Sequence, residues 1–144
     1  MKTRDQLTMD LFEVPVPTPS VPGAMNFNME LRHLLSDVLK DCPKSRAEVA
    51  AQMSALSGDH ITVHMLNAWT AESREGWRFA LEYLPAFEVA TETTAVTAWI
   101  ANIRGGKVLI GKEAIDAEIG KMERLRDEAT RKIKQLKQAM GDKE

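Results

Sequence analysis

The sequence has few of the residues that would tie it to a disulfide scaffold, a membrane or a nucleic-acid backbone. Its 144 residues include one cysteine, Cys42, which excludes a disulfide within them and is typical of a reducing compartment. No apolar run approaches the roughly 20 residues that span a bilayer, and we expect neither a signal peptide nor membrane contact. The net charge of −2 argues against a chain that binds nucleic acid along its whole length.

Catalytic and metal-binding patterns are also sparse. The segment GKVLIGK (106–112) has the spacing of a phosphate-binding loop, but Glu113 follows where a Ser or Thr should bind magnesium. His60 and His64 flank an expected helix start, and a lone cysteine completes no common zinc site. No nucleophile, base and orienting residue form a recognisable set. We therefore expect no enzyme activity, no metal and no cofactor.

Four segments differ in composition. Residues 1–24 form a polar tail that ends in VPVPTPSVPG, whose prolines favour an exposed, semi-rigid polyproline II tether. Residues 25–104 show helical apolar spacing and predict one globular domain. Residues 105–112 predict a short extended connector, and residues 113–144 one long helix.

Local signals predict four or five helices in the domain. NMELRHLLSDVLKD has apolar residues at helical spacing and is ended by Pro43. RAEVAAQMSALS follows a capping box of Ser45 and Glu48 and stops at Gly58. Its expected buried stripe is Val49, Ala50, Met53 and Leu56. The segments LEYLPAFEVATE and TTAVTAWIANI predict two further helices, with Pro85 in the first turn of the former.

The segment SALSGDHITVHMLNAWTAES (54–73) has the spacing of a helix-turn-helix, with Thr62 as the N-cap of a short second helix. In such a unit the second helix enters the major groove, and its first residues contact base edges. The expected base-contacting residues are Thr62, Val63, His64, Asn67 and Ala68. The expected phosphate contacts are Lys44, Arg46, Arg74 and Arg78.

The charge of this region leaves two functions open. From Cys42 to Arg104 there are five Lys or Arg and seven Asp or Glu, and the expected reading helix has neither Lys nor Arg. Phosphate contacts supply most affinity for DNA, so such a domain must bind weakly alone or act as an oligomer. The alternative is a non-catalytic protein–protein adaptor on the same fold that does not bind DNA.

The last segment has a heptad repeat. One core position of the repeat holds Ile119, Arg126, Ile133 and Met140, and the other holds Ile115, Met122, Ala129 and Leu136. A stripe this narrow and sustained predicts a coiled coil that joins two or more copies. The alternative is a long amphipathic helix that folds back on the domain. Neither the number of strands nor their direction follows from the repeat.

Two stretches of sequence resemble known proteins. Residues 45–92 resemble the lambda-repressor-like helix-turn-helix class, which implies sequence-specific binding of double-stranded DNA, often by a dimer. The whole chain, from MLNAWTAESREGWRF and TAWIANIRGGKVLIG in particular, is similar to small proteins of Mu-like transposable phages and prophages. This resemblance implies a phage-encoded protein in the cytoplasm of a bacterial host and brings a genomic setting more than an activity. Together with the helix-turn-helix it predicts a DNA-binding regulatory protein, either an activator or a repressor.

A short motif in the tail resembles a different binding peptide. TMDLF (8–12) is similar to the peptide that docks replication proteins on the bacterial sliding clamp, with Met9, Leu11 and Phe12 in the apolar slots and Thr8 replacing the usual Gln. The alternative is a strand or staple that packs on the same chain. In sum, the sequence predicts an all-α chain with a repressor-like domain and a long dimerising helix.

Overall fold

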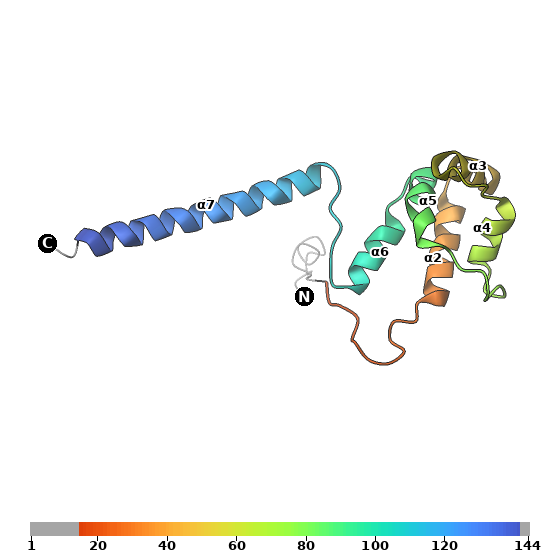
Figure 1. Cartoon of the computed structure of the whole chain (residues 1–144), viewed down its shortest axis with the longest axis horizontal. Coiled ribbons are helices and arrows are strands. Elements are labelled where there is room, and N and C mark those ends of the chain that lie inside the picture. Colours follow the sequence, from red (N-terminus) through yellow and green to blue (C-terminus); the bar gives the residue numbers. More distant parts are fainter. Residues whose placement is uncertain (1–14, 142–144) are drawn as a thin grey trace, which may run out of the picture. The chain divides into compact units, whose positions relative to one another are not determined.

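The computed structural model describes residues 15–141, and their regular secondary structure is entirely helical (Figure 1). The elements are α2 (Asn28–Asp41), α3 (Arg46–Ser57), α4 (Val63–Thr70), the 3-10 turn η1 (Leu81–Tyr83), α5 (Leu84–Thr91), α6 (Ala95–Ile103) and α7 (Lys112–Gly141). Contacts divide the chain into two units that meet between Lys107 and Val108, inside the expected connector. The tail motif with Met9, Leu11 and Phe12 lies outside the described residues.

The capping signals read from the sequence are present at α3 and α4. The Ser45 hydroxyl accepts from the Glu48 N–H at 3.2 Å, and the Glu48 carboxylate accepts from the Ser45 N–H at 2.6 Å. These two bonds, the backbone one foremost, hold the pKa of Glu48 below its ordinary value. Gly58 ends α3 in the left-handed region at φ +76°, and the Thr62 hydroxyl caps α4.

Helices α2 to α6 enclose one apolar core, in which α3 packs on α4 and α5, and α2 packs on α4 and α6. Its most buried large side chains are Leu35, Val49, Met53, Leu66, Phe87 and Val96. The expected buried stripe of α3 is confirmed except at Leu56, which lies in the last turn and is 52% exposed. Helical periodicity assigns Leu56 to the stripe but does not say how far the neighbouring helices extend along it.

The proline-rich stretch is more than a free tether. Most of residues 15–23 are exposed, but the Thr18 N–H donates to the Ile103 carbonyl at 2.8 Å, at the end of α6. Pro17 packs against Gly105, where an added Cβ would lie 2.9 Å from the Pro17 Cδ. Gly105 also has a φ of +74°, so both its backbone and its neighbour favour glycine there. The sequence predicts the extended conformation but not this attachment.

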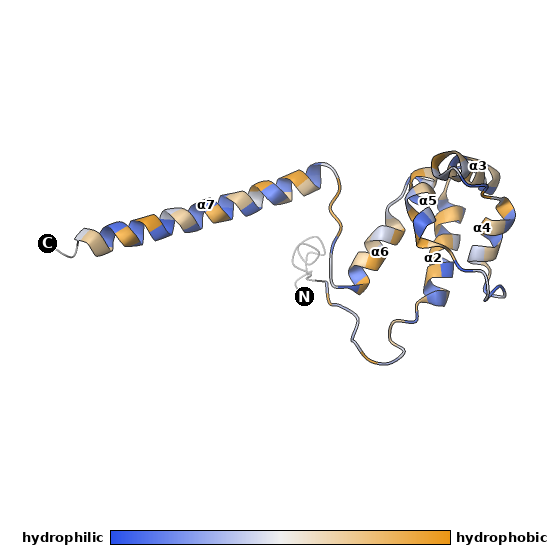
Figure 2. Cartoon of the chain, in the orientation of Figure 1, coloured by the Kyte–Doolittle hydropathy of each residue, from blue (hydrophilic) through white to orange (hydrophobic). Residues whose placement is uncertain are grey.

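The second unit consists mainly of α7, a single helix of 30 residues without a buried residue. Figure 2 shows apolar and polar residues alternating along it. None of the helices among residues 15–141 is long and apolar enough to cross a membrane.

The least expected contact of the first unit is made by Arg32 of α2, which is only 2% exposed. Its Nε donates to the side-chain oxygen of Asn28 at 3.1 Å. Its two terminal nitrogens lie 2.7–3.4 Å from the backbone carbonyls of Ala68, Trp69, Ala71, Arg74, Glu75 and Trp77. One guanidinium thus satisfies the C-terminal end of α4 and fixes the segment that follows it.

Replacing Arg32 by Met should remove these donors while keeping a long apolar stem. Because several buried carbonyls lose a charged donor, we expect the free energy of unfolding to fall by about 3 kcal/mol or more. Urea denaturation measures this loss. Lys40→Met, an exposed site on the same helix, is the matched control and should change stability by at most about 0.5 kcal/mol. A loss below about 1 kcal/mol for R32M would contradict this role of Arg32.

Candidate nucleic-acid interface

The turn between α3 and α4 is fixed by one hydroxyl. Ser54 Oγ accepts from the N–H of Ile61 at 2.9 Å and has two acceptors for its own proton, the carbonyls of Ala50 at 2.8 Å and Ile61 at 3.0 Å. Ile61 is buried, so its N–H would otherwise have no partner. Ala50 is buried as well, and its small side chain allows the helices to approach closely. Ser54 therefore sets the geometry of the helix pair.

A second bond ties this turn to the segment before α5. The Tyr83 hydroxyl donates to the carboxylate of Asp59 at 3.0 Å. This bond is the main reason that the pKa of Tyr83 is raised above its ordinary value, since it favours the protonated phenol. Both ends of the turn are thus held by side chains.

Helix α4 has one buried face and one exposed face. Leu66, Ala68 and Trp69 are buried, whereas His64 and Asn67 are exposed. The expectation that Ala68 contacts DNA is therefore wrong, because this residue is 2% exposed and faces the core.

The two residues at the start of α4 are less free than the sequence suggests. Thr62 is half-buried, and its hydroxyl accepts from the N–H of Met65 at 3.2 Å. Val63 is half-buried and packs against the core. Neither side chain is fully available to a base edge.

The exposed face of α4 carries a polar cluster that joins two helices. Arg46, in the first turn of α3, donates from one terminal nitrogen to the side-chain oxygen of Asn67 at 2.7 Å and to the hydroxyl of Thr70 at 3.2 Å. The Asn67 oxygen has a second lone pair and its amide group two N–H donors, so the bond to Arg46 leaves the pairing capacity of Asn67 largely intact. The structure thus brings Arg46 and Asn67 together.

The remaining cations expected to contact phosphate lie in different surroundings. The expectation that Lys44 contacts a phosphate is corrected by its surroundings. Its ammonium group donates to the Ala90 carbonyl at 2.9 Å and to Gln52 at 3.1 Å, and it lies 3.6 Å from a carboxylate oxygen of Glu92. These bonds complete the C-terminal end of α5 and occupy Lys44 within the domain. The side chain of Arg74 is exposed, while its backbone is held by Arg32. Arg78 is exposed beside an apolar groove.

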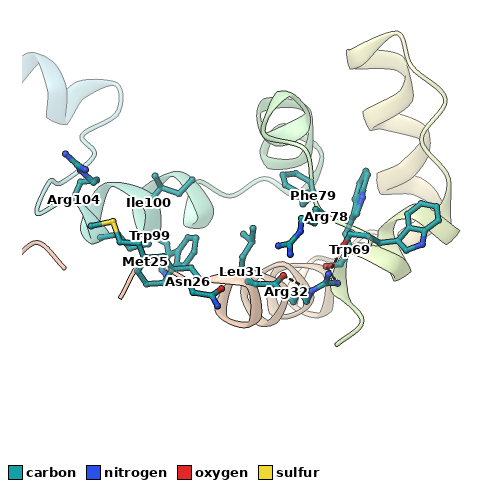
Figure 3. A pocket seen from close by; sticks show the side chains of 14 residues that line it. Met25, Asn26, Leu31, Arg32, Trp69, Arg78, Phe79, Trp99, Ile100 and Arg104 are labelled. Atoms are coloured by element: carbon teal, nitrogen blue, oxygen red, sulfur yellow. Dashed lines mark hydrogen bonds between the residues drawn. The ribbon is translucent and has the colours of Figure 1, made fainter. Parts of the chain in front are cut away.

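That groove is a feature of the first unit that the sequence did not predict (Figure 3). It has a volume of about 530 Å³ and is formed by the start of α2, the segment after α4 and the outer face of α6. Its apolar wall includes Met25, Leu31, Phe79, Trp99 and Ile100, and Arg78 and Arg104 also line it. Phe27 and Trp99 meet edge to face with their ring centres 5.6 Å apart. The only sequence signal for the groove is α6, whose Trp99 and Ile100 stay partly exposed beside one buried residue, Val96.

The histidines show no metal site. His64 packs edge to face on Trp77, with ring centres 5.6 Å apart, and His33 contacts Glu72. No cluster of three or more residues that could bind a metal occurs in residues 15–141.

Ser54→Ala should test the lock on the turn. The buried Ile61 N–H would lose its acceptor, so we expect the free energy of unfolding to fall by about 1–3 kcal/mol. Thermal and urea unfolding measure the change, with Ser73→Ala, at an exposed site in the loop after α4, as the control. Equal stability of the two variants would show that the Ser54 bonds do not hold the helix pair.

The arrangement brings a short helix with a polar outer face, an arginine bound to that face, and an apolar groove into one helical unit. In comparisons with known proteins, no family model, curated protein or solved structure matches the chain.

Proposed function

We propose that this chain is a phage-encoded regulatory protein that binds double-stranded DNA through α3 and α4, acts as an oligomer and catalyses no reaction. The observation that carries the proposal is the bond between Arg46 and Asn67, which places an arginine beside the exposed face of the short second helix. The resemblance to lambda-repressor-like domains and to proteins of Mu-like phages supports the same function.

The shape of the pair fits a reading unit. Helix α4 buries Leu66 and Trp69 and leaves His64 and Asn67 exposed. Its exposed face can therefore enter the major groove of DNA while its buried face stays packed on the core. The major groove of B-DNA is about 12 Å wide and admits one helix. In the proposed complex Asn67 pairs with the exposed edge of a base, adenine being the usual partner of an asparagine amide.

Arg46 has two roles in the proposed complex. One terminal nitrogen is bound to Asn67 and Thr70, which limits the rotamers of both. A guanidinium has five N–H donors in all, and those on its other two nitrogens remain for a phosphate beside the groove. Arg74, on the loop after α4, adds a second positive side chain.

Two cations near α4 are few for a protein that binds DNA. The affinity for DNA and the dependence of that affinity on salt both grow with the number of phosphates contacted. A single domain with few such contacts should therefore bind weakly. Joining copies through α7 doubles the contacts. The second half of this helix adds Arg131, Lys132, Lys134 and Lys137.

The apolar groove favours a second candidate, a protein–protein adaptor that does not bind DNA. Its wall of Trp99, Ile100 and Phe79 beside Arg78 and Arg104 is the composition of a site for an apolar peptide with an acidic residue. The two functions differ in which surface matters, so separate variants distinguish them.

Selection from a random DNA pool, followed by mobility shifts, tests the regulatory function. We expect a sequence-specific complex at about 50 mM salt that weakens steeply toward about 200 mM. Asn67→Ala should reduce discrimination at one base by about 1–3 kcal/mol, whereas Arg46→Ala and Arg74→Ala should weaken binding to all sequences and lower the salt slope by about one each. Asn102→Ala, at an exposed site on α6, is the matched control.

Ile100→Glu separates the two candidates. It places a charge in the groove at a side chain that is already 38% exposed, so the fold should tolerate it. The regulatory function predicts unchanged DNA affinity for this variant. Failure of the unaltered chain to form any sequence-specific complex at low salt, while α7 still pairs, would falsify the regulatory function and leave the adaptor.

A further inference from the structure

Helix α7 has an apolar stripe that the other described residues of the chain leave exposed. The exposed fractions are 62% for Ile115, 52% for Ile119, 53% for Ile133, 66% for Leu136 and 76% for Met140. A groove of about 560 Å³ follows the first half of the stripe, from Ile115 to Arg126. Side chains of this kind on one face of a helix predict a partner with the same heptad spacing.

The charges beside the stripe change sign along the helix. The charged residues at the positions that flank the core of the heptad repeat are Asp116, Glu118 and Glu123 in the first half, and Lys132 and Lys137 in the second. Flanking positions are those that face the second helix of a coiled coil and decide its orientation. The acidic half of one copy is therefore complementary to the basic half of another only when the two helices run in opposite directions.

We propose that two copies of this chain pair through α7 in antiparallel orientation, with Arg126 of each copy facing Ala129 of the other. In this register Ile119 faces Leu136, Met122 faces Ile133, and Ile115 faces Met140. Asp116 then lies beside Lys137 of the second copy. The proposal rests on the self-association in the proposed function and not on DNA binding.

Arg126 selects this register among the antiparallel ones. It is the one charged side chain at a core position of the repeat, and its guanidinium turns aside to Asp127 at 3.1 Å. Opposite Ala129 it meets the smallest core residue, which leaves room for its stem to reach solvent. A shift by one heptad places Arg126 against Met122 or Leu136 and leaves two of the eight core residues of each helix without a partner.

Parallel pairing in register has opposite consequences. Arg126 would face Arg126, and Ala129 would face Ala129, so a like-charge layer would adjoin a cavity. The flanking pairs would be Glu118 with Glu123 and Lys132 with Lys137, both of like charge. These repulsions are absent from the antiparallel dimer.

Disulfide formation between single cysteines tests orientation and register without DNA. The full chain with Cys42→Ser receives either Ile119→Cys or Leu136→Cys, and one of the two carries a short tag that changes its mass. The two are mixed, unfolded, refolded and oxidised. In the proposed dimer residue 119 faces residue 136, whereas two residues 119 lie about 25 Å apart, too far for a disulfide.

The expected result is a disulfide-linked dimer of tagged and untagged chains in the mixture and almost none in either variant alone. Disulfide-linked dimers in the separate samples would overturn the antiparallel orientation. No disulfide in any sample would overturn pairing through α7, and it would leave DNA binding by α3 and α4 to be judged from the mobility shifts.

A charge reversal gives an independent readout by sedimentation. Lys137→Asp places two like charges together in the antiparallel dimer, so the dissociation constant should rise roughly tenfold, and Asp116→Lys in the same chain should restore it. In a parallel dimer the carboxylate introduced by K137D would face Lys132, and the substitution would instead tighten association. Lys134→Asp, which makes the same change away from the core, is the control. A lower dissociation constant for K137D would overturn the proposal.

Discussion

The first unit depends on one buried charge without a carboxylate partner. Arg32 is surrounded by backbone carbonyls of α4 and of the seven residues after it, so its charge is stabilised by peptide dipoles rather than by an ion pair. The same bonds hold the chain between α4 and η1, which has no regular structure of its own. Near its end this segment carries Phe79, whose ring packs edge to face on both Trp69 and Phe87. Arg32 therefore links α2, the end of α4 and the aromatic part of the core.

This arrangement explains how α4 can be short and still present a defined surface. A helix of eight residues has marginal stability alone, and most of its backbone groups belong to its first or last turn. Here the first turn is capped by Thr62 and the last by Arg32 from inside the domain. The cation that satisfies the negative end of the helix is thus buried, and the outer face needs no Lys or Arg for stability. The low surface charge of α4 is consistent with weak reading of DNA as well as with an adaptor.

The sequence predicted what local chemistry determines. Ser45 with Glu48, Gly58 and Thr62 set helix ends through neighbours within four residues, and each prediction was confirmed. Predictions that depend on distant neighbours were incomplete or wrong. Ala68 and Lys44 resemble surface residues until the core and α5 are placed around them. Arg32 shares a buried stripe with Leu35 and Leu39, but an arginine there indicates a buried guanidinium only when its carbonyl partners are known. The groove is formed by three distant segments, of which only α6 carries a local signal.

Helix α7 differs from these features of the first unit because its proposed partner is a second copy with the same sequence. Complementarity between the two helices can therefore be judged from one chain. The charged residues beside its core are acidic in the first half and basic in the second, so a copy turned by 180° is the matching surface. Arg126 and Ala129 supply a large and a small residue near the centre of that symmetry. In the proposed dimer α7 of each chain begins at Lys112. The two Lys112 residues lie at opposite ends of the paired helices, about 45 Å apart at 1.5 Å per residue. This exceeds the roughly 34 Å of one turn of DNA. If the chain binds DNA as proposed, the starts of the two helices in an antiparallel dimer are therefore further apart than the centres of two adjacent half-sites.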